Sequence, residues 1–328
     1  MLTSKLLKGI PHSHDDIHAL LTNDSGGFIQ AILDCIPMPV FYRCIKGIYL
    51  GCNHAFSEAI GLNKNEIIGN DLFHIFPKDQ AESYLENDAQ LLKAPGSCVY
   101  ESEMRTFDER KFYVRFHKVS FNDKTGNVAG FLGMFEDLTD QKKMEKELHR
   151  LATRDHLTQI YNRRAIETKL IKEIVIALKY YRSISVAMLD LDGFKKLNDN
   201  HGHQLGDQLL QCVASQLLSQ RRASDYIGRF GGDEFIIIMP HTSLSDAEQY
   251  TFQLRRYLET HCFGAFPSEV GVSVGVASLS SENMVGKSAS QVLDELIAQA
   301  DSAMYRDKGA GREGSITKIC PTCDILAG

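Results

Sequence analysis

From Asp225 to Met239 the chain reads Asp-Tyr-Ile-Gly-Arg-Phe-Gly-Gly-Asp-Glu-Phe-Ile-Ile-Ile-Met. This stretch predicts a β-hairpin, in which Gly231-Gly232 forms a two-residue turn with positive φ and residues 235–239 form a buried strand. Glycine also leaves the backbone open to a ligand. Asp233 and Glu234 follow the turn directly, and adjacent carboxylates there suit a divalent cation held against a phosphate. For this short pattern alone, a solvated acidic turn is the commoner alternative.

A second acidic pair lies upstream of the hairpin. Asp190 and Asp192 end the apolar segment 184–191, which predicts a strand, and ligand sites favour strand ends in α/β sheets. Together with the carboxylates of the turn, this pair forms an acidic cluster able to bind Mg²⁺, which takes carboxylate and phosphate oxygens. The next segment, Gly193-Phe194-Lys195-Lys196, offers backbone N–H groups and a lysine for phosphates.

Two further sets of residues suit a nucleotide. Asn198 and Asp207 are side-chain types that pair with a purine edge, since an amide both donates and accepts and a carboxylate accepts from guanine N–H donors. Lys308 and Arg312 lie four residues apart around Gly309 and Gly311. Such spacing on a tight loop is typical of a cationic clamp for a polyphosphate.

Strands and helices alternate along the second half of the chain. Helices are predicted from about residue 164 to 180, over 206–220 and over 245–259, and a further strand over 270–277. The alternation predicts an α/β domain, a central sheet with helices on its faces.

The first half predicts a different architecture. Short strands over 40–43 and 48–50 precede a helix over 53–60, and longer strands follow over 97–105, 111–120 and 128–135. This order predicts an α+β domain, an antiparallel sheet with flanking helices. Residues 140–155 then predict a helix with a narrow apolar stripe of Met144, Leu148 and Leu151. The stripe has the width of a two-helix seam in a dimer, although a helix lying on its own domain fits the periodicity equally well.

Composition excludes several classes of protein. The net charge of −6 over 328 residues gives no case for nucleic-acid binding, and no run approaches the 18 apolar residues of a membrane span. No signal peptide is indicated, so we expect a cytoplasmic protein. Eight scattered cysteines suit free, mostly buried thiols. The Cys320 and Cys323 pair lacks the further ligands of a zinc site, which leaves free thiols or a redox role.

The second half resembles the GGDEF domain of diguanylate cyclases over residues about 152 to 315. The signature is residues 231–235, Gly-Gly-Asp-Glu-Phe, and the segment 190–199 matches the family's metal and nucleotide segment. Further agreement lies in the segments His201-Gly202-His203, Gly206-Asp207, Ser273-Val274-Gly275, Ala300-Asp301, Ala303-Met304-Tyr305, Lys308 and Gly311-Arg312. Agreement at five separated places excludes a chance match, so the solvated-turn alternative is rejected.

The resemblance implies a role for each matched residue. Asp190, Asp233 and the Leu191 carbonyl bind Mg²⁺ (or Mn²⁺), and Asp233 or Glu234 helps to deprotonate a ribose hydroxyl. The other implied roles are guanine binding by Asn198 and Asp207, a nucleotide contact by His203 beside Phe194, and phosphate binding by Lys195, Lys308 and Arg312. The implied reaction joins two GTP molecules into cyclic di-GMP and releases two pyrophosphates, which needs a homodimer because each domain holds one GTP.

An inhibitory site is also implied. Arg222 and Asp225 form an Arg-x-x-Asp pattern five residues before Gly231, which resembles the family's site for feedback inhibition by cyclic di-GMP. Arg255 or Arg256 is a candidate second arginine. The chain departs from the family at Asp307, where alanine is usual, and at Glu313, where asparagine is common. Both place an acid beside the cationic clamp.

The first half resembles a PAS sensor domain. The segments that carry this resemblance are Ile36-Pro37-Met38-Pro39-Val40, Asn53-His54-Ala55-Phe56, Gly61, Ile67-Ile68-Gly69 and Asp137-Leu138-Thr139. No residue of this domain identifies its ligand. Haem, flavin, a small molecule and no ligand at all stay open as alternatives. His54, His74 and His117 are candidate ligating residues, and surface or core histidines are the commoner alternative.

The predicted organisation has five parts. These are a polar leader over 1–27, a PAS sensor domain over 28–139, a helical signalling linker over 140–155, a GGDEF domain over 156–315 and a tail over 316–328. The predicted function is a sensor-regulated diguanylate cyclase. The alternative is a catalytically silent GGDEF domain that binds GTP or cyclic di-GMP and signals by contact. The sequence leaves the sign of the signal open.

Overall fold

The structure is a computed structural model that describes residues 25–106, 109–267, 270–279 and 288–309. The chain divides into two compact units, residues 1–146 and 147–328, and each is described by itself. Most of the predicted polar leader, Arg312 and the Cys320/Cys323 pair lie outside the described residues. In the described part of the chain, none of the helices combines the length and apolar content that a membrane crossing requires.

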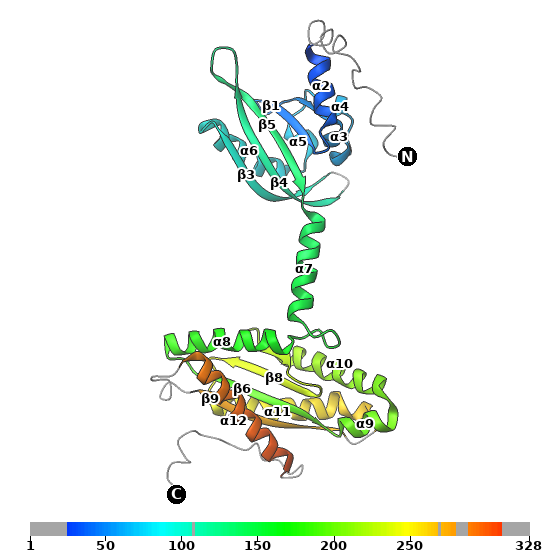
Figure 1. Cartoon of the computed structure of the whole chain (residues 1–328), viewed down its shortest axis with the longest axis vertical. Helices are drawn as coiled ribbons and strands as arrows, with labels where there is room; N and C mark the ends of the chain where they lie inside the picture. The colour runs from blue at the N-terminus through cyan, green and yellow to red at the C-terminus, as the bar shows by residue number, and fades with distance from the viewer. Residues whose placement is uncertain (1–24, 107–108, 268–269, 280–287, 310–328) are drawn as a thin grey trace. The chain divides into compact units, whose positions relative to one another are not determined.

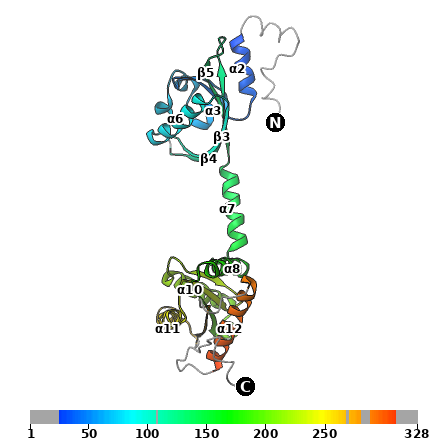
Figure 2. The same ribbon diagram turned by 90° about the vertical axis from the view of Figure 1, so that its left-hand side faces the viewer.

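The first unit is built on a five-stranded antiparallel sheet in the order β2-β1-β5-β4-β3 (Figure 1). The strands are β1 (Val40–Cys44), β2 (Tyr49–Cys52), β3 (Ser97–Arg105), β4 (Lys111–Asn122) and β5 (Val128–Asp137). The helices are α2 (Ser25–Cys35), α3 (His54–Ile60), α4 (Lys64–Ile67), α5 (Leu72–Ile75) and α6 (Lys78–Lys93). Helices α3 and α6 cover one face of the sheet (Figure 2). The expected α+β PAS-like fold is confirmed.

Local signals explain the start of α3. Asn53 is fully buried, and its side-chain oxygen accepts from the Phe56 N–H at 2.9 Å, as an N-cap residue should. Its amide group donates to three backbone carbonyls between α2 and β1. Gly61 ends the helix with a φ of 81°, a left-handed conformation that favours glycine. One asparagine therefore connects three segments of this unit.

The helix α7 (Thr139–Thr153) follows β5. Its first turn is attached to the sheet, because the Tyr113 N–H donates to the Thr139 hydroxyl at 2.9 Å and the Leu138 N–H donates to the Tyr113 carbonyl at 2.7 Å. No residue of α7 is buried. Met144, Leu148 and Leu151 are 67%, 60% and 58% exposed, so the apolar stripe does not lie on the chain's own domain.

The second unit contains a four-stranded antiparallel sheet in the order β7-β8-β6-β9. Its strands are β6 (Ile184–Asp192), β7 (Tyr226–Arg229), β8 (Glu234–Pro240) and β9 (Gly271–Leu279). Its helices are α8 (Arg163–Tyr180), α9 (Phe194–His201), α10 (His203–Gln220), α11 (Leu244–His261) and α12 (Ala289–Gly309), with a short 3-10 helix, η1 (Phe263–Ala265).

Both faces of this sheet are buried. Leu189, Leu191 and Ile237 pack with α10 and α11, whereas Met188 and Ile238 pack with α8 and α12. This two-sided burial explains why β6 and β8 read as continuous apolar runs rather than as alternating patterns. Figure 2 shows the two helix pairs on opposite faces of the sheet. The expected mixed α/β domain is confirmed, but its neighbouring strands run antiparallel.

The cysteines correct one expectation. Cys212 of α10 and Cys262, at the end of α11, form a disulfide pair with their Cα atoms 6.2 Å apart, so they are not free thiols. The pair forms because both residues lie in the core between α10 and α11. Of the four free cysteines in the described residues, only Cys52 is buried. The sequence could not show that two cysteines 50 residues apart meet in one core.

Candidate active site

The acidic residues meet because β6 and β8 are antiparallel neighbours. The strand register places Asp190 opposite Glu234, and the Leu191 N–H donates to the Asp233 carbonyl at 3.2 Å. On the other side of β6, Asp192 accepts from the Ser273 hydroxyl of β9 at 2.9 Å. The predicted acidic cluster is therefore assembled by the register of antiparallel strands. It was predicted from the general preference of ligands for strand ends in α/β sheets.

The turn between β7 and β8 differs from the one predicted. Residues 230–233 connect the strands, and neither Gly231 nor Gly232 has a positive φ. A side chain at Gly231 would collide with the Glu234 carboxylate, whereas one at Gly232 would meet nothing within 4 Å. A side chain at Gly231 would therefore displace the Glu234 carboxylate, and Gly232 leaves open space above the backbone.

Arg229 holds this turn in place. Its guanidinium donates to the Gly232 carbonyl at 2.6 and 3.1 Å and to the Asp155 carboxylate at 3.1 Å. Asp155 also accepts from the backbone and hydroxyl of Thr158. The turn is thus connected to the segment that begins the domain. Neither Arg229 nor Asp155 had a predicted role, although Arg229 stands in the stretch 225–239 that defines the hairpin.

Burial and mutual repulsion act on the carboxylates. Burial, and then the neighbouring Asp190 carboxylate, raise the pKa of Asp233. Burial raises the pKa of Glu234 as well, followed by Asp190 and Asp233. Burial also raises the pKa of Asp192, partly offset by its bond to Ser273. The cluster therefore holds more negative charge than its own surroundings compensate.

Lys308 is the cation that the structure places in this cluster. Its ammonium group donates to Asp190 at 2.6 Å, and that bond is the main reason why the pKa of Lys308 is raised. Its side chain is 48% exposed. An exposed lysine exchanges partners at little cost, so Lys308 can pair with Asp190 or with an incoming phosphate. Arg312, the other half of the predicted clamp, lies outside the described residues.

The donor set suits a hard divalent cation. Asp190 and Asp233 offer carboxylate oxygens and Leu191 a carbonyl oxygen, the ligand types that Mg²⁺ prefers. Burial is the main cause of the raised pKa of Asp233, followed by the Asp190 charge, and a bound cation would offset both. Within the described ranges, no group of three or more His, Cys, Asp or Glu side chains is already arranged as a metal site.

The predicted guanine-binding residues lie on two adjoining helices. Asn198 is on α9, and Asp207 and His203 are on α10. The side-chain oxygen of Asn198 is buried without a hydrogen-bond partner and lies against Gly206, where any side chain would collide with it. A buried acceptor without a partner is costly, so it suits a ligand that donates to it.

The remaining predicted residues of this region are placed on the same two helices. Phe194 is half-buried at the start of α9, and Lys195, His203 and Asp207 are exposed. Exposure leaves all three polar side chains accessible to a nucleotide.

The Arg222–Asp225 segment forms a closed turn before β7. Asp225 is 2% exposed, and its carboxylate accepts from the Arg222 N–H at 3.0 Å. The Arg222 side chain is exposed and lies 5.7 Å from the Tyr250 ring centroid. Burial and the Asp225 charge raise the pKa of Tyr250 to about 12. The four residues of β7 join this turn to the Gly231–Gly232 turn, a path of roughly 13 Å.

Of the two candidates for a second arginine, Arg255 is engaged elsewhere, and Asp307 has a structural role. Arg255 forms a largely buried ion pair with Asp307, so it is not free to join Arg222. Asp307 also accepts from the Val274 N–H at 3.0 Å. Asp307 therefore connects α12, α11 and β9 inside the domain, and its charge also contributes to the raised pKa of Asp192.

The three candidate histidines of the first unit lie away from its core. His54 is exposed on α3 and pairs with Glu58, and His74 is exposed on α5. His117 faces outward from β4, because the inward positions of that strand are Val114, Phe116 and Lys118. The same alternation buries Lys118, a residue that the sequence analysis missed.

Comparisons with known proteins agree with these features. Residues 152–314 match the family described as diguanylate cyclase, GGDEF domain, and residues 16–140 match the PAS domain family. A diguanylate cyclase of Vibrio cholerae is 27% identical over 300 residues, covering 90% of this chain and 91% of that protein.

Two further proteins are similar over the second half of the chain. A probable diguanylate cyclase of Escherichia coli K12, DgcC, is 34% identical over 54% of this chain, which spans 46% of that protein. The coiled coil and GGDEF domain of Caulobacter crescentus DgcB, solved with cyclic di-GMP, is 28% identical with a TM-score of 0.47, covering 53% of this chain and 89% of that one.

Proposed function

Since the chain belongs to the GGDEF family of diguanylate cyclases and carries a PAS domain, we propose that it is a PAS-regulated enzyme that condenses two GTP molecules into cyclic di-GMP. One observation carries this proposal: Asp190, Asp233 and Glu234 meet at one end of the β6–β8 pair beside Lys308. A purely structural turn has no use for repelling carboxylates with raised pKa values.

The proposed chemistry assigns a task to each of these residues. Asp190, Asp233 and the Leu191 carbonyl would hold Mg²⁺, which when bound stabilises charge on the reacting phosphate. Glu234, or Asp233 beside it, takes the proton of the ribose 3′-hydroxyl. Their raised pKa values bring these carboxylates closer to neutral pH, where a general base is more effective. The new bond forms from the 3′-oxygen to the α-phosphorus as the bond to pyrophosphate breaks.

Substrate binding uses the remaining residues. Lys195, Lys308 and Arg312 bind phosphates, and Lys308 leaves Asp190 when it does so. Asn198 and Asp207 pair with guanine, with His203 and Phe194 beside them. The partnerless Asn198 oxygen supports this role, because guanine carries N–H donors that could reach it.

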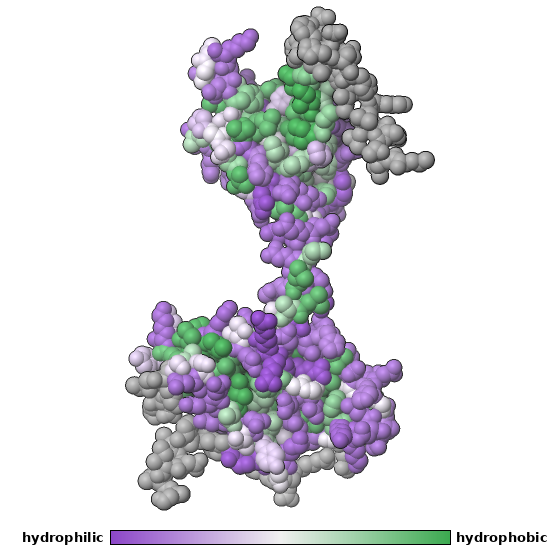
Figure 3. Space-filling model, in the orientation of Figure 1, coloured by the Kyte–Doolittle hydropathy of each residue, from purple (hydrophilic) through white to green (hydrophobic). Residues whose placement is uncertain are grey.

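Two GTP molecules on two domains require a homodimer. The exposed Met144, Leu148 and Leu151 stripe on α7 supports pairing of this helix with a second copy, and Figure 3 shows exposed apolar side chains along α7. In the proposed division, the sensor (28–139) acts on the catalytic domain (156–315) through the linker (140–155). Cyclic di-GMP inhibits at Arg222 and Asp225.

The decisive experiment is synthesis of cyclic di-GMP by the purified full chain, freed of bound nucleotide and supplied with GTP and Mg²⁺. We expect product from the wild type and none from Asp233→Ala, while Asp294→Ala, an exposed change on α12, retains activity. Arg222→Ala is expected to retain synthesis and escape inhibition by added product.

A folded dimer that binds GTP but makes no cyclic di-GMP would refute the proposed cyclase activity and favour the catalytically silent binding module. If Arg222→Ala is inhibited at the same product concentration as the wild type, the proposed feedback site is refuted and the proposed cyclase activity is unaffected.

A further inference from the structure

The core of the PAS domain contains three charged side chains. Arg43 of β1, Asp88 of α6 and Lys118 of β4 are 1%, 4% and 3% exposed. Arg43 and Lys118 both bind the Asp88 carboxylate, one at each oxygen. Buried charges are normally paired one to one. Here one carboxylate serves two cationic side chains.

Several donors of this cluster have no partner. The Nε and Nη1 atoms of Arg43 are buried without a hydrogen bond, and so is the Tyr100 hydroxyl. A guanidinium group only donates, so these positions can be met only by an acceptor. Both oxygens of Asp88 are already in use. The cluster therefore needs an acceptor that the described residues do not supply.

Aromatic rings surround the two cationic groups. The Arg43 guanidinium carbon lies 4.7 Å from the Phe131 ring centroid and 5.0 Å from that of Tyr49. The Lys118 ammonium lies 5.2 Å from the Phe116 and Tyr100 rings. Ring faces offset part of the cost of burying a cation. The rings do not accept hydrogen bonds from the N–H groups that lie in the plane of the Arg43 guanidinium.

A small cavity lies among these groups. It has a volume of about 10 Å³ and is lined by Arg43, Lys118 and the rings of Phe41, Phe56 and Phe116, among others. That is room for about one water-sized particle. Tyr84 lines this cavity and also an outer pocket of about 330 Å³ between α6 and β3.

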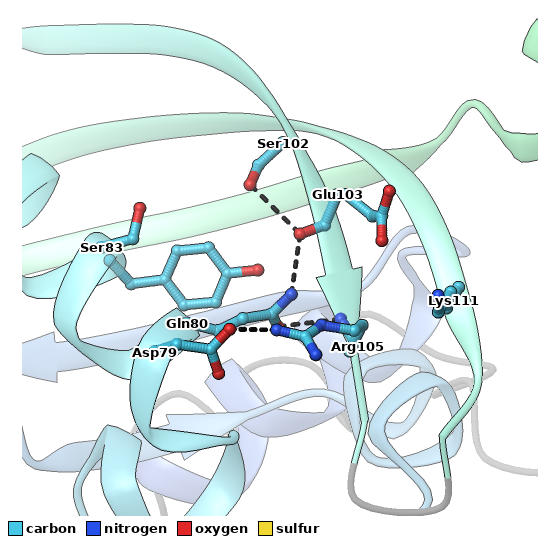
Figure 4. Close-up of a pocket in the computed structure, with 8 residues that line it drawn as sticks. Asp79, Gln80, Ser83, Ser102, Glu103, Arg105 and Lys111 are labelled. Atoms are coloured by element: carbon cyan, nitrogen blue, oxygen red, sulfur yellow. Dashed lines mark hydrogen bonds and ion pairs between the residues drawn. The ribbon is translucent and has the colours of Figure 1, made fainter.

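The outer pocket provides an approach from solvent. Its polar walls are formed from α6 by Asp79, Gln80 and Ser83, from β3 by Ser102, Glu103 and Arg105, and from β4 by Lys111 (Figure 4). Because Tyr84 belongs to both walls, a movement of that one ring is the shortest way to connect the pocket with the buried cluster.

We propose that the PAS core binds one monatomic monovalent anion, a halide, through Arg43 and Lys118, which both line the cavity. The anion supplies the missing acceptor and balances the second cation. A water molecule would fit the space, but it would bring two hydrogens of its own and no charge. This site is independent of the nucleotide site, so its test does not rest on cyclase activity.

The test measures binding of ³⁶Cl-chloride to the full chain by equilibrium dialysis, with sodium gluconate holding the ionic strength constant. Thermal unfolding of the PAS domain is followed in the same buffers. We expect saturable binding of one anion per chain. A concentration about ten times the Kd should raise the Tm of a domain of this size by roughly 5 °C relative to gluconate.

Substitutions locate the site. Lys118→Met leaves a balanced Arg43–Asp88 pair and should weaken binding at least tenfold. Arg43→Lys keeps the charge but removes the Nε and Nη1 donors that have no partner, and it should weaken binding several-fold. Lys124→Met, on an exposed hairpin loop, should bind as the wild type does. The proposal is overturned if no anion binds or if Lys118→Met retains wild-type affinity. If Lys118→Met does not fold, Arg43→Lys decides, and unchanged affinity in that variant refutes the site.

Discussion

The bond between Arg229 and Asp155 offers the sharpest test of how the Gly231–Gly232 turn is held. Arg229 makes three hydrogen bonds, two to the Gly232 carbonyl and one to Asp155, and the two side chains are only 14% and 16% exposed. Hydrogen bonds to charged groups contribute about 1.5–3 kcal/mol each when buried. Allowing for partial exposure, we expect Arg229→Met to lower the unfolding free energy by about 2 kcal/mol. In a domain of this size that lowers Tm by roughly 4–8 °C.

A double-mutant cycle isolates the ion pair from the other bonds. Asp155→Ala also loses the Thr158 contacts, but the cycle with Arg229→Met cancels that loss. We expect a coupling energy of about 1–2 kcal/mol at pH 7, measured by denaturant unfolding. Arg164→Met, an exposed change on α8, is the matched control and should leave stability unchanged.

The pH dependence of the coupling follows from Asp155. Burial raises its pKa, but bonds from Thr158 and the Arg229 charge outweigh burial, so the pKa of Asp155 is lowered. A carboxyl with a lowered pKa stabilises the fold above its unfolded value of about 3.9, and that stability is lost as pH falls through the folded value. The coupling should therefore be complete at pH 7 and decline below about pH 4. A coupling near zero at pH 7 would refute the claim that Arg229 connects the turn to Asp155.

Three further predictions concern the second unit. Asp233→Asn should raise the Tm of the metal-free protein at pH 7, because an ionised carboxylate whose pKa is raised in the folded state destabilises the fold. The gain in Tm should vanish near pH 4. A gain in Tm that does not change with pH would contradict this reasoning. Asp307→Ala should lower the unfolding free energy measured in urea by about 3 kcal/mol, because it leaves the Arg255 charge buried without a partner. The double variant Asp307→Ala/Arg255→Leu should recover much of that stability. Equal destabilisation of the single and double variants would exclude the ion pair as the cause. Gly206→Ala should displace the Asn198 side chain and raise the KM for GTP about tenfold with little change in Tm, and an unchanged KM would argue against guanine binding there.

The order of strands and helices was largely determined by local sequence. Strand β3 spans the predicted residues 97–105, and α8 ends at Tyr180 as expected, because apolar periodicity and caps act over a few residues. Helices α6 and α12 were missed. The Asp233-Glu234 pair was found because a glycine turn beside adjacent carboxylates is a local pattern, although the turn itself does not have the predicted positive φ.

What only the tertiary structure decided is which distant residues meet. Lys308 pairs with Asp190 across 118 residues, and Asp307 with Arg255 across 52, because α12 packs against the central sheet. In the PAS domain, the alternation of β4 was readable and places Lys118 inward. The meeting of Arg43 and Asp88 with Lys118, two cations to one carboxylate, depends on β1 and β4 lying in one sheet and on α6 covering its inner face. Local sequence specifies elements, whereas charge balance in a core depends on which elements pack together.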